Sequence, residues 1–204
     1  MHFDFNQIDA KIAYRLLTAT INPRPIAWVT SVAHDGVVNA APFSFFNIMG
    51  HNPPTVAIGL MRQEQGALKD TAQNIIDNQE FVINLVSEQQ AQDMNATCAA
   101  LPPDVNELAA ANIATRPALF VQPPLIAHSP VSMECVSQAT VVTGPNQIVV
   151  IGRILHFHID DQYVVDAEKG YVDTLALNLI SRMHGSGWYA RSTDLFQLDR
   201  PKHP

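Results

Sequence analysis

The sequence predicts a mainly β protein with peripheral helices, arranged as an antiparallel barrel. Segments with strand-like composition dominate the chain, and helical periodicity appears at only three or four places. Strands and helices do not alternate regularly, and no GxGxxG motif follows a strand, which disfavours a doubly wound dinucleotide-binding fold. Hairpin turn signals join several of the strands, so an antiparallel barrel fits best.

The first part of the chain is expected to contain a lead-in segment and a hairpin. Residues 9–20 carry apolar side chains at helical spacing, which fits a short helix or a turn-rich lead-in. Prolines 23 and 25 cannot lie inside a hydrogen-bonded ladder, so they are expected to open the strand 26–32. Asp35-Gly36 is a strong hairpin signal, and the return strand is expected at 37–41.

Residues 42–54 are expected to form a loop. This stretch holds three phenylalanines and a methionine, but its prolines and glycine disfavour a regular element. The apolar run 55–60 is expected to be a third strand that is buried on both faces.

The middle of the chain is expected to alternate briefly between helix and strand. A helix should begin at Lys69 or Asp70 and continue to residue 78, with an apolar stripe on one side. A strand is predicted at 80–86. Ser87 is then expected to cap a helix from 88 to about 99.

The last hundred residues contain the clearest hairpin in the sequence. Residues 100–130 hold six of the 14 prolines and are interpreted as an irregular excursion rather than a linker. Strands at 131–143 and 147–160 flank a Gly-Pro-Asn turn, and their apolar faces place them at the centre of the sheet. A helix at 174–183 and a short final strand at 195–198 complete the prediction.

The length of the chain suits a single domain over residues 1–204. Apolar residues make up 47% and charged residues 15%, which fits a compact body or a subunit that covers part of its surface with a partner. The net charge of -7 disfavours nucleic-acid binding. Cys98 and Cys135 have no metal-ligand spacing and are expected to be free thiols. We expect a cytoplasmic protein, because no signal-peptide pattern and no membrane-spanning run is found.

Three segments carry candidate chemistry: residues 24–47, Lys69-Asp70-Thr71, and Arg182-Met183-His184-Gly185 with Trp188-Tyr189 nearby. A helix start at Lys69-Asp70-Thr71 offers free N–H groups, a positive charge and a hydroxyl for a phosphate, unless Asp70 or Thr71 merely caps the helix. The rings of Ser44-Phe45-Phe46-Asn47 either anchor the loop or form a wall for a heteroaromatic ring. Arg24 could pair with a phosphate or form a surface ion pair.

Other chemical readings are weaker. His156 and His158 share a strand face beside two aspartates, but no third metal ligand is evident, and solvated side chains are the favoured interpretation. No GxSxG motif is present, so Ser44 does not suggest a hydrolase nucleophile.

A series of ordered blocks closely resembles the flavin reductase-like family, which includes flavoredoxins, flavin reductase components of monooxygenases and an archaeal ferric reductase. The likeness covers about residues 10 to 195 and is weaker over 100–130. Each block alone is weak, whereas the order is specific. The blocks are Asn22-Pro23-Arg24-Pro25-Ile26-Ala27-Trp28-Val29-Thr30-Ser31-Val32, Asp35-Gly36, Asn39-Ala40-Ala41-Pro42-Phe43-Ser44-Phe45-Phe46-Asn47, Pro53-Pro54-Thr55-Val56, Lys69-Asp70-Thr71, Asn74-Ile75, Glu80-Phe81-Val82-Ile83-Asn84-Leu85, Gly152-Arg153-Ile154 and Arg182-Met183-His184-Gly185-Ser186-Gly187-Trp188-Tyr189.

The resemblance implies an FMN-binding split β-barrel of antiparallel Greek-key type, usually a homodimer with flavin near the subunit interface. It implies that the isoalloxazine lies along residues 41–47 and that the phosphate meets the helix start and the strand near 28–31. The cofactor-binding residues carried over by position are Thr30, Ser31, Ser44, Asn47, Lys69 and Thr71, followed by Arg24, Trp28, Phe45, Phe46, Arg182 and His184.

The activity implied is an FMN-dependent oxidoreductase that takes hydride from NAD(P)H and passes electrons to an acceptor that the sequence does not identify. No side-chain nucleophile is required. His184 either lines the nicotinamide side or caps the preceding predicted helix at its C-terminal end. Two alternatives stay open: an FMN electron carrier without its own nicotinamide site, and a metal or small-ligand binder that uses the same barrel.

Overall fold

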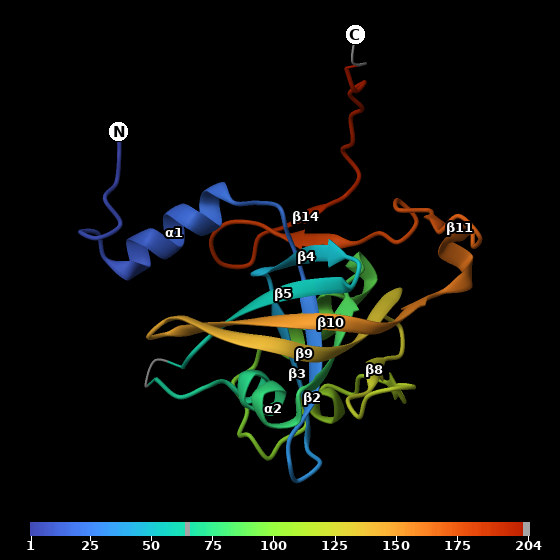
Figure 1. Ribbon diagram of the computed structural model, residues 1–204, viewed down its shortest axis with the longest axis horizontal. Helices are drawn as coiled ribbons and strands as arrows, with labels where there is room; N and C mark the ends of the chain where they lie inside the picture. Colours follow the sequence, from blue (N-terminus) through green and yellow to red (C-terminus); the bar gives the residue numbers. More distant parts are fainter. Residues whose placement is uncertain (64–65, 202–204) are drawn as a thin grey trace.

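The computed structural model describes residues 1–63 and 66–201, and its centre is a seven-stranded antiparallel sheet (Figure 1). This confirms the mainly β, antiparallel prediction. The strands pair in the order β3 (Val38–Phe43), β2 (Ala27–Val32), β6 (Glu80–Leu85), β9 (Val131–Gly144), β10 (Gln147–Ile159), β5 (Pro54–Met61) and β4 (Phe46–His51).

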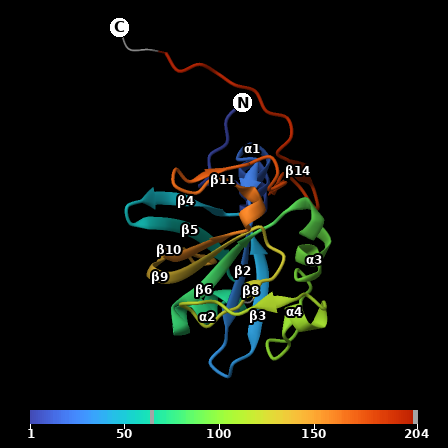
Figure 2. The same cartoon turned by 90° about the vertical axis from the view of Figure 1, so that its right-hand side faces the viewer.

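The sheet is strongly twisted, and its two halves run in crossing directions. In Figure 1, β4, β5, β10 and β9 lie across β2 and β3, and Figure 2 shows these four strands fanning away from the helices α3 and α4. β5 and β6 follow one another along the chain, but the β9–β10 hairpin separates them in the sheet. This non-sequential order is the one expected of a Greek-key barrel.

Two apolar clusters fill the two sides of the central strands. Ile58, Phe81 and Ile83 belong to a cluster inside the curled sheet. Trp28 and Met94 belong to a second cluster, where the other face of β2 meets the helices. Alternation along β2 therefore buries both of its faces, and every residue from Ala27 to Ser31 is buried.

Several predicted elements are confirmed. The lead-in is a helix, α1 (Ala10–Thr20), whose N-terminus is capped by the Asp9 carboxylate accepting from the backbone N–H of Lys11 at 2.7 Å. The predicted helix after Lys69 is α2 (Asp70–Asn78). The long hairpin is formed by β9 and β10, which occupy the centre of the sheet.

The expected loop at 42–54 is wrong, because most of it is strand. β3 extends to Phe43, and β4 pairs with β5 up to the turn at Asn52-Pro53, which has a cis peptide bond. A register shift between Ile48 and Gly50 accommodates the irregular composition within the ladder. β5 is fully buried on one face only, since its residues alternate between buried and half-buried positions.

Three predictions near the helices are also corrected. The helix expected at 88–99 is a 3-10 turn, Glu88–Gln90, followed by the short α3 (Ala91–Ala96), and the Ser87 side chain makes no capping hydrogen bond. The helix expected at 174–183 is replaced by turns and the strand β13 (Ile180–Arg182). The final strand is β14 (Tyr189–Arg191), whereas 195–198 contains none.

The last two corrections share one cause. β13 pairs with both β1 (Arg24–Pro25) and β14, so its extended form comes from backbone partners far away in sequence. A local helical pattern does not reveal such partners.

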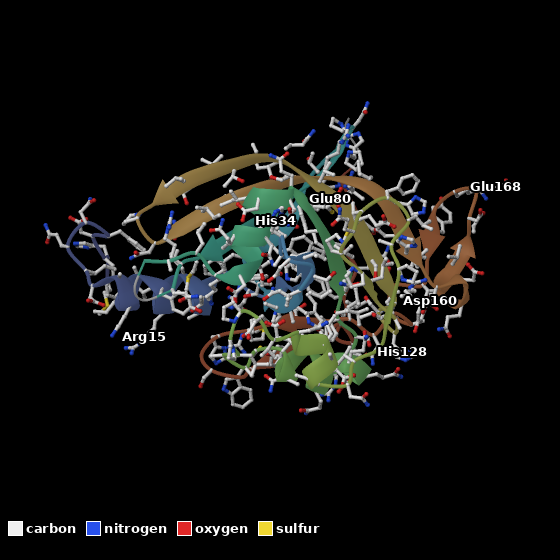
Figure 3. All side chains as sticks on the ribbon, turned by 90° about the horizontal axis from the view of Figure 1, so that it is seen from below. Arg15, His34, Glu80, His128, Asp160 and Glu168 are labelled. Atoms are coloured by element: carbon white, nitrogen blue, oxygen red, sulfur yellow. The ribbon has the colours of Figure 1, made fainter. Side chains whose placement is uncertain are left out.

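The irregular excursion contains only short elements: α4 (Glu107–Ala110), β7 (Thr115–Arg116) and β8 (Leu125–Ile126). The 3-10 turn Asp161–Tyr163, β11 (Val164–Asp166) and β12 (Tyr171–Val172) follow the long hairpin. Seen from below in Figure 3, Arg15 of α1 and Glu168 after β11 lie at opposite ends of the molecule. Within the described residues, no helix has the length and apolar character needed to cross a membrane.

Candidate functional site

A cavity of about 230 Å³ lies where the end of β3, α3 and the segment from β13 to β14 meet. It combines apolar side chains, a hydroxyl, an amide, a thiol and a guanidinium. Among its lining residues none is a carboxylate. The lining residues are Ile26, Pro42, Phe43, Ser44, Met94, Asn95, Cys98, Arg182, Gly187 and Tyr189.

Arg182 and Tyr189 form one wall of this cavity. They are directly opposite one another in the β13–β14 ladder, and the Arg182 guanidinium carbon lies 5.0 Å from the centre of the Tyr189 ring. The guanidinium also donates to the carbonyl oxygens of Gly185 and Trp188, at 2.8 and 3.2 Å. These contacts hold a positive charge at the cavity wall.

The loop between β13 and β14 turns sharply because two glycines adopt positive φ, +59° at Gly185 and +80° at Gly187. His184 stacks on the exposed Trp188 ring, with ring centres 6.3 Å apart and planes inclined by 12°. The sequence left open whether His184 caps a helix. It does not, because the helix predicted before it is a strand.

A bend at Ser44 and Phe45 adjoins the cavity, which Ser44 lines and Phe45 does not. The Phe45 carbonyl accepts from the backbone N–H of Gly59 at 2.6 Å, and a Cβ at Gly59 would lie 3.0 Å from that of Phe45. The Phe45 ring also lies 6.2 Å from Tyr14 of α1. The bend is therefore held between β5 and α1.

The other residues predicted in this bend lie outside the cavity lining. Phe46 is half-buried and packs against the apolar cluster inside the sheet, which matches its interpretation as an anchor. Asn47 is exposed, and its side chain accepts from the backbone N–H of Ile48 at 2.8 Å.

Arg24 does neither of the two things considered from the sequence. Its side chain is buried, and its guanidinium donates to the carbonyls of Thr18, Ile21 and Met183 and to Ser44 Oγ. It is therefore neither exposed to a phosphate nor part of a surface ion pair. Burial lowers the pKa of Arg24, with Tyr14 opposing the shift and Arg182 adding to it.

The charges of Lys69 and Arg182 both act electrostatically on Cys98. Desolvation raises the pKa of this cavity-lining thiol, and Arg182 and Lys69 both act to lower it. The Lys69 ammonium is thus electrostatically coupled to the cavity, although Lys69 itself starts a different helix. Two cations therefore influence a site whose lining includes no carboxylate.

The start of α2 lies beside β3, at a position on that strand away from the Ser44 bend. Asn39 and Thr71 are buried and linked by a side-chain hydrogen bond of 2.7 Å, which fixes the helix start to β3. Asn39 and Phe43 are four residues apart on that strand, or about 13 Å. The start of α2 is therefore fixed to β3 about four residues before the end of that strand at the cavity.

Four residues carried over by position have no surface available to a ligand in this structure: Trp28, Thr30, Ser31 and Thr71 are all buried and internally bonded. Trp28 Nε1 donates to Thr97 Oγ1 at 3.0 Å, and Thr30 Oγ1 donates to the Pro124 carbonyl at 2.5 Å. Ser31 Oγ accepts from Asn74 at 3.1 Å. Their hydrogen bonds join β2 to the surrounding segments, so we assign them to the framework.

Sequence reasoning missed the contribution of α3. Met94 and Asn95 of α3 line the cavity together with Cys98 in the turn that follows, but nothing in the local sequence distinguishes them from their neighbours. Tyr189 lies in the segment after Arg182 that the sequence singled out, but it was not among the predicted site residues.

A second cavity, of about 320 Å³, lies beside the β2–β3 turn and α2. Asp35, Asp70 and Asp77 are among its lining residues. Their negative charges disfavour a phosphorylated ligand, so the larger volume does not make this cavity the better candidate.

The fold and the cavity define a class: a split β-barrel whose site lies at the barrel end, between a polar bend and a cationic loop. The family model described as "Flavin reductase like domain" matches residues 19–174. The chain belongs to the flavin reductase-like family, which confirms the resemblance found in the sequence.

Solved structures agree with this assignment. Nitrilotriacetate monooxygenase component B from Bacillus cereus is 34% identical, with a TM-score of 0.91 over 97% of this chain and 98% of that one. The 2-nitrobenzoate 2-nitroreductase NbaA of Pseudomonas fluorescens is 30% identical, with a TM-score of 0.88 over 98% and 96%. A protein with a split barrel domain from Shewanella frigidimarina NCIMB 400 shares the fold at 19% identity, with a TM-score of 0.82 over 98% and 100%.

Proposed function

We propose that this protein binds FMN in the cavity between the Ser44 bend and the Arg182 wall, and that it works as an FMN-dependent oxidoreductase. Family membership supports a flavin as the ligand. The observation that carries the proposal is a carboxylate-free cavity lined by Arg182, whose guanidinium is held by two carbonyl oxygens and the Tyr189 ring.

The residues present fit such a ligand. Phe43, Met94 and Tyr189 offer apolar surface for a planar ring, and Ser44 and Asn95 offer polar contacts to its edge. Lys69 stands beside the free N–H groups at the start of α2, and its positive charge together with these N–H groups offsets the Asp70 carboxylate there, which suits a phosphate. The spacing of about 13 Å along β3 separates these two environments.

A bound flavin would supply the redox chemistry of the proposed reaction, in which NAD(P)H is the hydride donor. The chain's own residues bind, orient and set the electrostatic environment. Arg182 is held rigidly by two carbonyls and an aromatic ring, so its positive charge is already in place to stabilise negative charge that develops in the cavity. Electrostatic preorganisation of this kind requires no side-chain nucleophile.

We further propose that the protein is a homodimer. A volume of about 230 Å³ is below the range of about 300–1,000 Å³ usual for ligand sites, which is consistent with a second copy completing the walls. Phe120, Leu155 and Phe157 leave large apolar side chains exposed along and beside β10. Burying them against a partner would remove this apolar surface from water.

An FMN electron carrier without its own nicotinamide site is the second candidate. The chain shows no recognisable nicotinamide-binding motif, so this alternative remains. Purified protein loaded with FMN should lose its yellow colour when NADH or NADPH is added if it is a reductase. Colour that persists with both nucleotides, but bleaches with dithionite, would favour the carrier.

The binding proposal is tested by titrating the protein into FMN and following flavin fluorescence. Lys69→Ala should weaken FMN binding by ~1–2 kcal/mol, because it removes a charge-assisted contact. Lys169→Ala is the matched control, since Lys169 forms an exposed ion pair with Asp166 near β11. Equal dissociation constants for wild type and Lys69→Ala would remove Lys69 from the site, and no binding by wild type would refute the proposal.

A further inference from the structure

One buried arginine connects three segments around the candidate site. Arg24 is only 8% exposed. Its Nη1 donates to the carbonyls of Thr18 and Ile21 at the C-terminal end of α1, each at 2.8 Å. Its Nη2 donates to the Met183 carbonyl at 2.7 Å, and its Nε donates to Ser44 Oγ at 3.4 Å.

No carboxylate forms an ion pair with Arg24 within the described part of the chain. Burying a cation without a counter-ion is costly, so the guanidinium depends on its carbonyl partners and on the negative end of the α1 dipole. Lysine could not contact all four acceptors, because only guanidinium presents a planar fork of five N–H donors. The position therefore requires the shape of arginine as well as its charge.

The contact with Ser44 determines what that hydroxyl can do. A serine hydroxyl has one proton to donate and two acceptor lone pairs. Because Arg24 Nε can only donate, Ser44 Oγ must be the acceptor in this bond, which leaves its own proton free. Ser44 lines the cavity, so this proton is available to an acceptor atom there.

The contact with Met183 acts on the other wall. Met183 begins the loop that carries Gly187 and leads to Tyr189, both of which line the cavity. Backbone bonding between Met183 N–H and the Trp188 carbonyl at 2.9 Å closes the same loop. A single side chain thus sets the separation between the Ser44 bend and the loop after β13.

We propose that Arg24 is a positioning residue of the flavin site: it holds Ser44 as an acceptor, so that the serine hydroxyl donates to the bound ring, and it fixes the facing loop. This inference rests on the proposed function. It also changes the role that sequence position suggested for Arg24, from contacting the phosphate to orienting a residue that contacts the ligand.

The test is a double-mutant cycle on FMN affinity, measured by flavin fluorescence with Arg24→Lys, Arg24→Gln and Ser44→Ala. Ser44→Ala should weaken binding about tenfold through loss of one hydrogen bond. Each Arg24 variant should weaken binding at least as much, because it also releases the facing loop. Adding Ser44→Ala to an Arg24 variant should weaken binding little further, because the Arg24 change has already lost the oriented serine donor.

A control cycle separates positioning from general collapse of the site. Arg24→Lys combined with Lys69→Ala should show fold-changes that multiply, since the two residues act at different ends of the ligand. Non-additivity with Lys69 as well as with Ser44 would mean that the arginine only maintains the fold. Thermal melting of each variant shows whether the chain is folded during the measurement.

Two results overturn the inference without touching the proposed function: wild-type FMN affinity in Ser44→Ala, or Arg24 and Ser44 effects that multiply. The first result does not depend on whether the Arg24 variants fold. Failure of the wild-type protein to bind FMN at all would instead refute the proposed function.

Discussion

The imidazole Nε2 of His158 lies 2.6 Å from Oε1 of Glu134, a carboxylate with no exposed surface. The same carboxylate accepts from the backbone N–H groups of Leu119, Phe120 and Val121, at 2.9, 2.6 and 3.2 Å. One side chain of β9 thus joins β10 to the irregular segment that crosses it. His158 is therefore part of a buried network rather than a solvated strand end, as its sequence context had suggested.

Removing the charge of Glu134 should destabilise the protein. Glu134→Gln replaces an acceptor-only group with an amide whose N–H₂ faces backbone donors, so we expect a loss of ~2–4 kcal/mol in the free energy of unfolding. Urea denaturation measures this loss in the free energy of unfolding. Glu80→Gln is the control, because Glu80 accepts a single N–H, from Gln122, at the edge of the same segment. Equal losses in the two variants would contradict a special role for Glu134.

The stability that Glu134 contributes should disappear in acid. Burial alone raises the pKa of this carboxyl, but the hydrogen bonds from Leu119, His158 and Phe120 outweigh burial, and the pKa is lowered. A carboxyl with a lowered folded-state pKa stabilises the fold above its unfolded pKa of about 4.3, and this contribution is lost as the pH falls through the folded value. The free energy of unfolding, measured from pH 6 downward, should therefore fall less steeply in Glu134→Gln than in wild type.

Gly152 should not tolerate a side chain. A Cβ at this position would lie 2.5 Å from Cζ of Phe81, a buried ring in the main apolar cluster, and 3.4 Å from Val56. We expect Gly152→Ala to lower the free energy of unfolding by ~1–3 kcal/mol through overpacking. Gly144→Ala is the matched control in the same hairpin, where the nearest atom would be 3.6 Å away. An unchanged free energy of unfolding in Gly152→Ala would show that the Phe81 ring can move aside.

The two cysteines should react differently with iodoacetamide. Cys98 is exposed and lines the candidate cavity, whereas Cys135 is buried in the apolar cluster with a strongly raised pKa. Mass spectrometry should therefore find Cys98 alkylated and Cys135 unmodified in the folded protein. Saturating FMN should slow alkylation at Cys98 if FMN binds as proposed. Equal rates with and without FMN would place the flavin elsewhere.

Local signals in the sequence were sufficient for elements whose pattern and partners are close together. The hairpin at residues 131–160 was predicted because a short turn joins its two adjacent strands. The helix α2 was predicted from its apolar stripe and its clear start at Lys69. The helix expected at 174–183 failed because β13 obtains its partners from Arg24–Pro25 and Tyr189–Arg191. The loop expected at 42–54 failed in the same way, through pairing with β5.

The sequence by itself determined the family, the antiparallel barrel and two of the segments at the cavity, the Ser44 bend and the Arg182 loop, because these depend on composition, turn chemistry and the order of motifs. Only the tertiary structure decided which side chains face the cavity. Trp28 and Thr30 lie in a matching block but are buried, and Arg24 reaches Ser44 rather than a ligand. The physical reason is that hydrogen-bond partners distant in sequence, such as Thr97 for Trp28 and Met183 for Arg24, determine whether a polar group is free.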